Sequence, residues 1–321
     1  ADHGAYASPR PSPDGRYLYA MRGAVDEPPT PVRLDAREPD QRPSRLRAPG
    51  VPVTLPGALT EVTTRADDGQ ELRAWLALPD GASATGPTPL VVFIHGGPLS
   101  SWNAWQWRWN AWIMAAHGYA VLLPDPALSV GYGLDFVRRG WGAWGDRPYT
   151  DLMALTDAAV KRDDIDETRT AAMGGSFGGY MANWVAGHTD RFRAIVTHAS
   201  LWALEDMNAT TDEAPYWERE FGDPLKRPER YTANTPHLRV DNIRTPMLVI
   251  HGDKDYRVPV GQALRLWWDV FKRGVDAKFL YFPDENHWVL KPGHIKVWYD
   301  TVLAFLAHHV QGEEWRRPEL L

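Results

Sequence analysis

The chain contains no cysteine among its 321 residues. Disulfide scaffolds, thiolate metal sites and cysteine nucleophiles are therefore excluded together. No apolar run approaches the roughly 20 residues that a membrane-spanning helix needs, so we expect no membrane partner. Basic residues are in the minority, with 35 Lys and Arg against 41 Asp and Glu and a net charge of −6. This balance gives no support to a nucleic-acid partner, because phosphate binding requires a basic surface.

The first residues lack a basic segment followed by an apolar one, so no secretory leader is visible. We expect a cytoplasmic location. Because Ala1 need not be the natural start, a leader upstream of it stays an open alternative.

Prolines are concentrated between residues 28 and 56, where there are eight. Each one removes a backbone donor, so we predict a loop and linker over this stretch. Just before it, Asp14-Gly15 predicts a tight turn and residues 17–20 a short strand. This pattern is similar to part of a β-propeller blade, although no second copy is found. An ordinary terminal hairpin is the alternative.

From residue 58 onward, strand-like and helix-like segments alternate. Residues 58–65 and 71–78 predict an antiparallel hairpin. Short apolar runs, typical of strands buried on both faces, follow at 90–94, 120–123, 170–173, 194–197, 247–250 and 278–282. Helical periodicity covers 151–162, 180–188, 260–273 and 294–309. This order predicts an α/β fold with a mostly parallel sheet and helices on both faces.

One segment, 200–245, has no strong strand pattern and is rich in Pro, Trp and Glu. An insertion of this kind commonly shapes the ligand site of an α/β sheet. We therefore divide the chain into residues 1–57, a catalytic domain over 58–312 and a tail over 313–321.

The candidate nucleophile is Ser176, in the G-x-S-x-G pattern of Gly174, Ser176 and Gly178. A serine on a sharp strand-to-helix turn needs small residues two positions before and after it, because backbones approach closely there. A predicted strand precedes the pattern and a predicted helix follows it. A phosphate-binding loop is excluded, because neither a G-K-[ST] ending nor a G-x-G-x-x-G register is present.

A nucleophilic serine needs an orienting acid and a histidine base, which follow it in that order on this fold. Asp253 and Asp255 come directly after a predicted strand, and both are candidates. His287 lies in a polar loop after the last predicted strand, which favours it as the base over His294. The oxyanion would be held by backbone N–H groups of the His95-Gly96-Gly97 loop and of Phe177.

These motifs resemble the prolyl oligopeptidase (S9) family of serine peptidases, in its acylaminoacyl peptidase and dipeptidyl peptidase 5 branch. The resemblance covers about residues 58 to 312 and rests on HGGP at 95–98, GGSFGGYMANW at 174–184, HGDKDYRVP at 251–259 and FPDENHWVLKP at 282–292. It implies an α/β-hydrolase fold preceded by the remnant of a β-propeller. In the family's pattern Ser176 is the nucleophile, Asp255 rather than Asp253 the acid, His287 the base, and Gly97 with Phe177 the oxyanion donors.

The resemblance further implies a peptide substrate and a β-propeller region that restricts entry, on the same longer polypeptide or on a separate chain. We expect no cofactor and no metal, and a homo-oligomer is an open alternative. The chain departs from the family at Ala127, where relatives usually have an Arg.

The 16 tryptophans are unusually many, and several crowd the segment after the oxyanion loop. We expect most of them to pack in the core, with Trp102 and Trp105, together with Tyr132, as candidate substrate contacts. The acidic residues Asp212, Glu213, Glu218 and Glu220 predict a solvated face, or alternatively a patch that draws the amine of a peptide to the cleft.

The function expected from these residues is cleavage of short peptides through an acyl-enzyme. An esterase or amidase acting on small acyl compounds is the nearest alternative, because the same triad cleaves esters. A hydrolase domain that only binds is the third, and the presence of serine, acid and histidine together argues against it.

Overall fold

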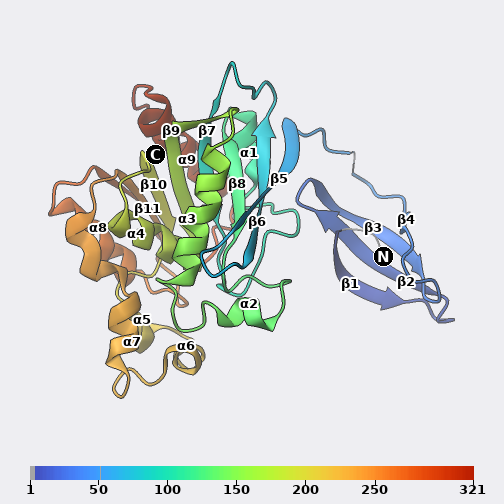
Figure 1. The fold of residues 1–321 in the computed structure, drawn as a ribbon, viewed down its shortest axis with the longest axis horizontal. Coiled ribbons are helices and arrows are strands. Elements are labelled where there is room, and N and C mark those ends of the chain that lie inside the picture. The colour runs from blue at the N-terminus through green and yellow to red at the C-terminus, as the bar shows by residue number, and fades with distance from the viewer. Residues whose placement is uncertain (1–3, 51) are drawn as a thin grey trace.

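The computed structural model describes residues 4–50 and 52–321. It contains a small antiparallel sheet at the N-terminus and a larger mixed sheet flanked by helices (Figure 1). Within the described residues, no helix is both long enough and apolar enough to cross a membrane.

The N-terminal sheet has four strands in the order β1-β2-β3-β4: Ala5–Pro11, Tyr17–Ala24, Glu27–Asp35 and Ser44–Arg45. Its core is only Ala20, Val32 and Leu34, with Tyr6 and Leu18 packed against them. The sheet stands apart from the main body in Figure 1. Its β2–β3 turn touches that body, because the Trp112 indole N–H donates to the Val25 carbonyl at 2.9 Å.

The prediction of a loop from residue 28 was wrong over β3, which contains three of the eight prolines. Pro28 and Pro29 lie where the β2–β3 register shifts, so they interrupt no regular pairing. The Pro31 carbonyl accepts from the Leu46 N–H at 2.9 Å. The Pro31 nitrogen, which has no hydrogen to donate, therefore also faces the short edge strand β4 rather than β2. Beyond β4 the chain has no regular element up to β5, as predicted, with residue 51 outside the described residues.

The main sheet has eight strands in the order β12-β11-β10-β9-β7-β8-β6-β5. The bounds are β5 Gly57–Arg65, β6 Glu71–Pro79, β7 Thr88–Ile94, β8 Ala120–Asp125, β9 Ile165–Gly175, β10 Ala194–His198, β11 Met247–Gly252 and β12 Ala277–Phe282. All neighbours from β8 to β12 are parallel, whereas β5 and β6 form an antiparallel hairpin. The predicted hairpin and α/β-hydrolase fold are confirmed, and five of the six predicted buried runs are buried. The prediction was wrong for 278–282, because β12 is the edge strand of the sheet and leaves Tyr281 exposed.

The alternation of side chains along each strand divides the core into two layers. Along β7, Leu90, Val92 and Ile94 belong to one layer, whereas Val91 and Phe93 belong to the other. The first layer is covered by α3 (Arg147–Val160), α4 (Phe177–His188) and α8 (Gly261–Phe271). The second is covered by α1 (Ala111–Ala116) and α9 (Pro292–Gln311), so helices lie on both faces.

The insertion between β10 and β11 consists of short helices: α5 Leu204–Thr210, α6 Ala214–Phe221, α7 Pro228–Asn234 and η1 Pro236–Asn242. It contains no strand, as predicted. Because it leaves the carboxyl end of β10, it lies at the edge of the sheet where α/β folds place their ligands. Helix α2 (Leu134–Arg138) follows β8 at the same edge.

Candidate active site

Ser176 connects β9 to α4 in a strained left-handed conformation, with φ 58° and ψ −122°. The two glycines of its pattern are required by close approach rather than by their own dihedral angles. A Cβ on Gly178 would lie 2.0 Å from the Ile94 carbonyl oxygen, and one on Gly174 would lie 2.3 Å from the Gly178 backbone. The turn therefore lifts Ser176 out of the sheet while β7 and α4 pack tightly beneath it.

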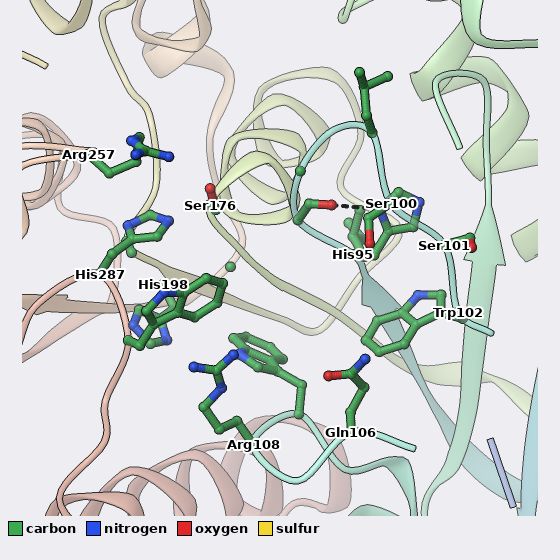
Figure 2. Close-up of a pocket in the computed structure, with 18 of the residues that line it drawn as sticks. His95, Ser100, Ser101, Trp102, Gln106, Arg108, Ser176, His198, Arg257 and His287 are labelled. Carbon is green, nitrogen blue, oxygen red and sulfur yellow. Dashed lines mark hydrogen bonds between the residues drawn. The ribbon is translucent and has the colours of Figure 1, made fainter. Parts of the chain in front are cut away.

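Asp255 and His287 form a hydrogen-bonded pair. The Nδ1–H of His287 donates to Asp255 Oδ2 at 2.7 Å, and the Asp255 side chain is fully buried. The second oxygen accepts from the backbone N–H groups of Arg257 at 3.0 Å and Val258 at 2.9 Å. Ser176 and His287 line the same cleft (Figure 2). The structure therefore brings together the acid, the histidine and the serine that the sequence predicts.

A second imidazole also contacts Asp255. His251 Nε2 lies 3.3 Å from Asp255 Oδ2 and 2.7 Å from the Val258 carbonyl oxygen. Burial raises the pKa of Asp255, but hydrogen bonds from His251 and His287 outweigh it and hold the pKa well below its ordinary value. Asp255 is thus kept as a carboxylate, the form that fixes the tautomer and orientation of a catalytic histidine.

Glu285 holds the loop that carries His287. Its buried carboxylate accepts from the backbone N–H groups of Leu290 and Lys291, both at 3.1 Å, and from His294 Nδ1 at 2.6 Å. Gly252 lets this loop approach β11, because a Cβ there would lie 2.5 Å from the Glu285 and Asn286 carbonyl oxygens.

The two alternatives that the sequence left open lie elsewhere. Asp253 is exposed and interacts with the Tyr281 hydroxyl rather than with a histidine of the cleft. His294 is bound to Glu285 at 2.6 Å rather than to Asp255. The geometry therefore favours Asp255 over Asp253 and His287 over His294.

The predicted oxyanion donors flank the serine. Gly97, with φ +126°, follows β7 and lines the cleft. Phe177 is the first residue of α4, so its N–H has no acceptor inside the helix. A Cβ on the neighbouring Gly96 would lie 3.0 Å from the Gly175 carbonyl oxygen, which shows how closely this loop packs on the serine turn. Phe177 is itself buried and directly follows Ser176, so the assignment of these two N–H groups as oxyanion donors stays a prediction.

The cleft has a volume of about 360 Å³ and is partly open. Of the three predicted substrate contacts, Trp102 lines it. Trp105 is buried, packs against Trp107 and lies outside the lining residues. Tyr132 is also outside the lining, because its hydroxyl donates to Asp125 Oδ2 at 2.6 Å.

Asp125 connects Tyr132 to the cleft wall. Its other oxygen accepts from the Trp102 backbone N–H at 2.9 Å. Tyr132 thus contacts the cleft through Asp125 rather than by touching a ligand. Ala127, which departs from the family pattern, is fully buried, and its N–H donates to Asp151 at 2.9 Å.

The acidic residues of the insertion do not form one solvated face. Asp212 and Glu213 bind Arg257 at 2.8 and 3.1 Å, and Arg257 lines the cleft. Glu220 is buried, and its Oε1 accepts from the Trp144 indole N–H at 2.6 Å and from the Gly142 N–H at 3.0 Å. Burial raises the pKa of Glu220 to about 7 despite these two bonds.

The tryptophans divide between core and cleft. Trp144 is fully buried and packs against Phe177, Tyr180, Trp217 and Phe221. Trp109, Trp217 and Trp288 line the cleft beside Trp102. Of the two tryptophans predicted as substrate contacts, the structure places Trp102 but not Trp105 in the cleft, and it adds three that the sequence did not single out.

Several polar cleft residues were also missed: Gln106, Arg108, His198 and Arg257. His198 is buried beneath Trp109, and burial, together with the charges of His251 and His287, lowers its pKa to about 3. Trp288 could have been found, because it directly follows His287. Arg108 carries no sequence signal beyond its place in the tryptophan-rich segment.

One group of side chains could hold a metal ion. In the part of the chain that the structure describes, ligand atoms of Asp276, His308 and His309 lie within 4.8 Å of one another. Asp276 precedes β12, so the group is at the opposite edge of the sheet from the cleft. It therefore has no part in chemistry at Ser176.

Comparison with known proteins agrees with this geometry. The prolyl oligopeptidase family model matches residues 105–313. A probable dipeptidyl-peptidase 5 of Emericella nidulans is 38% identical over 244 residues, which are 74% of this chain and 34% of that protein. Dipeptidyl-peptidase 5 of Aspergillus fumigatus is 36% identical over 256 residues, 77% of this chain and 35% of that protein.

Among solved structures, an acylaminoacyl peptidase of Pyrococcus horikoshii superposes with a TM-score of 0.88 at 21% identity. The match covers 98% of this chain and 51% of that one, and at this identity it shows the fold. The chain thus spans about a third of the curated relatives and half of the solved structure. Because the family model covers more than half of its residues and the relatives exceed 30% identity, this chain belongs to the prolyl oligopeptidase family.

Proposed function

We propose that this chain carries the catalytic site of a serine peptidase that cleaves short peptides in the manner of a dipeptidyl or acylaminoacyl peptidase. The observation that carries the proposal is the 2.7 Å bond between His287 and a buried Asp255, in the cleft that Ser176 lines. The names of the curated relatives support the same class of substrate.

The proposed reaction begins when His287 Nε2 takes the proton of the Ser176 hydroxyl. The Ser176 oxygen attacks the scissile carbonyl, and the oxyanion accepts hydrogen bonds from the N–H groups of Gly97 and Phe177. His287 then gives its proton to the leaving amine as the carbon–nitrogen bond breaks. Water, deprotonated by His287, releases the acyl group and restores Ser176. Asp255 stabilises the imidazolium at both stages.

Replacing Ser176 by Ala tests the nucleophile. We expect turnover to fall by about 10⁶-fold, with the fold retained, because Ala keeps the Cβ of Ser and removes only the hydroxyl. The wild type should react with a fluorophosphonate at Ser176, and the variant should not. Retained activity in the variant would place the nucleophile elsewhere, and failure to label the wild type would favour a domain that only binds.

An esterase or amidase remains the second candidate, because the same groups act on both bonds. Comparing kcat/KM on a dipeptide amide, an N-acetyl amino-acid amide and a short acyl ester separates the two. A dipeptidyl type should turn over the dipeptide amide and an acylaminoacyl type the N-acetyl amino-acid amide, whereas an esterase should act on the ester alone. An amidase of small acyl compounds should cleave the amides but release no products from longer peptides. Product masses from a peptide mixture then distinguish release of single acylated residues from release of dipeptides.

We further propose that residues 1–57 belong to a β-propeller region, on the same longer polypeptide or on a separate chain. The four-stranded antiparallel sheet β1–β4 supports this, because a propeller blade has that form. Intact mass and gel filtration of the protein isolated from its source test it. A stable, peptide-selective monomer of these residues alone would contradict the proposal, and a multiple of the chain mass would indicate a homo-oligomer.

A further inference from the structure

Two arginines line the cleft, and they differ in their partners. Arg257 binds Asp212 and Glu213 of the insertion. Within residues 4–50 and 52–321, no carboxylate forms an ion pair with Arg108. Burial alone lowers the pKa of Arg108, so its charge is partly desolvated, and the described residues place no carboxylate beside it. An uncompensated guanidinium in a cleft is a site for an anion.

The position of Arg108 is fixed by its surroundings. Its backbone carbonyl accepts from the Tyr299 hydroxyl, and that hydroxyl accepts from the Asn110 N–H at 3.0 Å. The guanidinium lies 4.0 Å from the centre of the Trp288 ring. This cation–π contact holds the charged end of the side chain against the Trp288 ring at the cleft wall. Little conformational entropy would be lost when this side chain binds a ligand.

The chemistry of the site identifies which end of a substrate Arg108 faces. The leaving amine must receive its proton from His287, so the leaving group lies on the side of that residue. Trp288 follows His287 directly, and their ring centres are 5.2 Å apart. The Arg108 guanidinium packs over the Trp288 ring. In Figure 2, Arg108 and Arg257 lie on opposite sides of His287. Arg257 is already paired with the insertion, which leaves Arg108 as the arginine available to a group on the leaving-group side.

We propose that Arg108 binds a carboxylate on the leaving-group side of the scissile bond, so that short peptides ending just beyond it are preferred. This rests on the peptidase function proposed above. The carboxylate is the C-terminus of the peptide or an acidic side chain of the residue after the scissile bond. A guanidinium binds either through two parallel N–H groups. If the carboxylate is the C-terminus, long peptides would place a neutral amide there and lose this contact.

The test compares kcat/KM on one short peptide with a free C-terminal acid and on the same peptide amidated. A second pair, both amidated, has Asp or Asn after the scissile bond. In Arg108→Gln we expect the acid-to-amide ratio, or the Asp-to-Asn ratio, to fall by about 10- to 100-fold. Arg108→Lys should restore part of it, because the charge remains without the planar fork.

Arg138→Gln is the matched control, because this arginine is exposed on α2 and pairs only with Asp135. It should leave both ratios unchanged. A loss confined to the first pair identifies the C-terminal carboxylate, and a loss confined to the second identifies an acidic side chain. An equal loss on every peptide, or none, would overturn the proposal, because a role in holding the cleft together does not distinguish acid from amide.

A binding experiment separates this proposal from the one on which it rests. The Ser176→Ala protein, with Arg108 intact, is titrated calorimetrically with the acid and amide forms of both peptide pairs. We expect the acidic member of one pair to bind about 10-fold tighter at low salt. Equal affinities within both pairs would refute the role of Arg108 even in an active enzyme. Absence of any turnover in the wild type would instead refute the peptidase proposal.

Discussion

Asp255, after β11, and Glu220, on α6, are both buried carboxyl groups, and the protein treats them in opposite ways. Asp255 has donors on both oxygens: two imidazoles on one and two backbone N–H groups on the other. Glu220 has two donors on Oε1, whereas its buried Oε2 has no partner within the described residues.

The pKa of Asp255 is lowered, and that of Glu220 is raised to about 7. Burial favours the neutral form of both carboxyl groups. The number of hydrogen-bond donors around each group therefore decides the direction in which its pKa shifts. The loop after β11 therefore stabilises the ionised form of its buried carboxyl group. In the insertion, burial keeps Glu220 protonated until the pH approaches 7.

The largest expected effect comes from removing the charge at Asp255. Asp255→Asn should lower kcat by about 10⁴-fold, because the amide can hold His287 in the wrong tautomer. Asp253→Asn, two residues away and exposed, is the control and should change kcat by less than about twofold. Similar losses in the two variants would show that the acid of the triad had been misassigned.

A smaller effect is expected from moving the His287 loop without changing a charge. Gly252→Ala places a methyl group 2.5 Å from two carbonyl oxygens of that loop, which must then shift. We expect kcat to fall by about 10²-fold, because displacement of about 1 Å is enough to misalign a base. Gly261→Ala, where nothing lies within 4 Å, should retain full activity. Normal kcat in Gly252→Ala would mean that the loop tolerates displacement.

The smallest effect on activity, but a clear one on stability, is expected at Glu220. As the pH rises from 4.5 to about 7, the unfolded chain loses the Glu220 proton while the folded chain keeps it. The contribution of Glu220 to the free energy of unfolding is therefore complete below pH 4.5. It falls by about 3 kcal/mol as the pH rises to about 7.

Glu220→Gln imitates the neutral form at every pH. It should match the wild type in free energy of unfolding near pH 4 and exceed it by about 3 kcal/mol at pH 8. Denaturant titrations of both proteins across this range measure the difference. A difference that stays constant with pH would show that Glu220 ionises normally.

The serine turn, the alternating strands and helices, and the order of serine, acid and histidine could be predicted from local patterns. Gly174 and Gly178 identify the turn because no other residue fits so close to β7 and α4. His287 could be preferred over His294 because a loop after the last strand lies at the carboxyl edge of the sheet.

The failures have a common cause. The strand at Glu27–Asp35 tolerates each of its prolines because of the neighbouring strand that the proline faces. The neighbouring strand is set by the order of strands in the sheet. Tyr132 lies outside the cleft because Asp125 binds its hydroxyl. Glu220 resembles its solvated neighbours in composition, yet the fold buries it against Trp144. In each case a residue's role was set by a contact in the folded structure that its local sequence pattern does not reveal.

The sequence by itself determined the α/β fold, the candidate triad and the absence of thiol chemistry, because period, spacing and residue type are local properties. Only the tertiary structure decided which carboxyl groups ionise and which tryptophans face the cleft. It also decided which arginine has no counter-ion. Those properties depend on desolvation and on donors that the fold brings from elsewhere, such as His251 and His287 around Asp255.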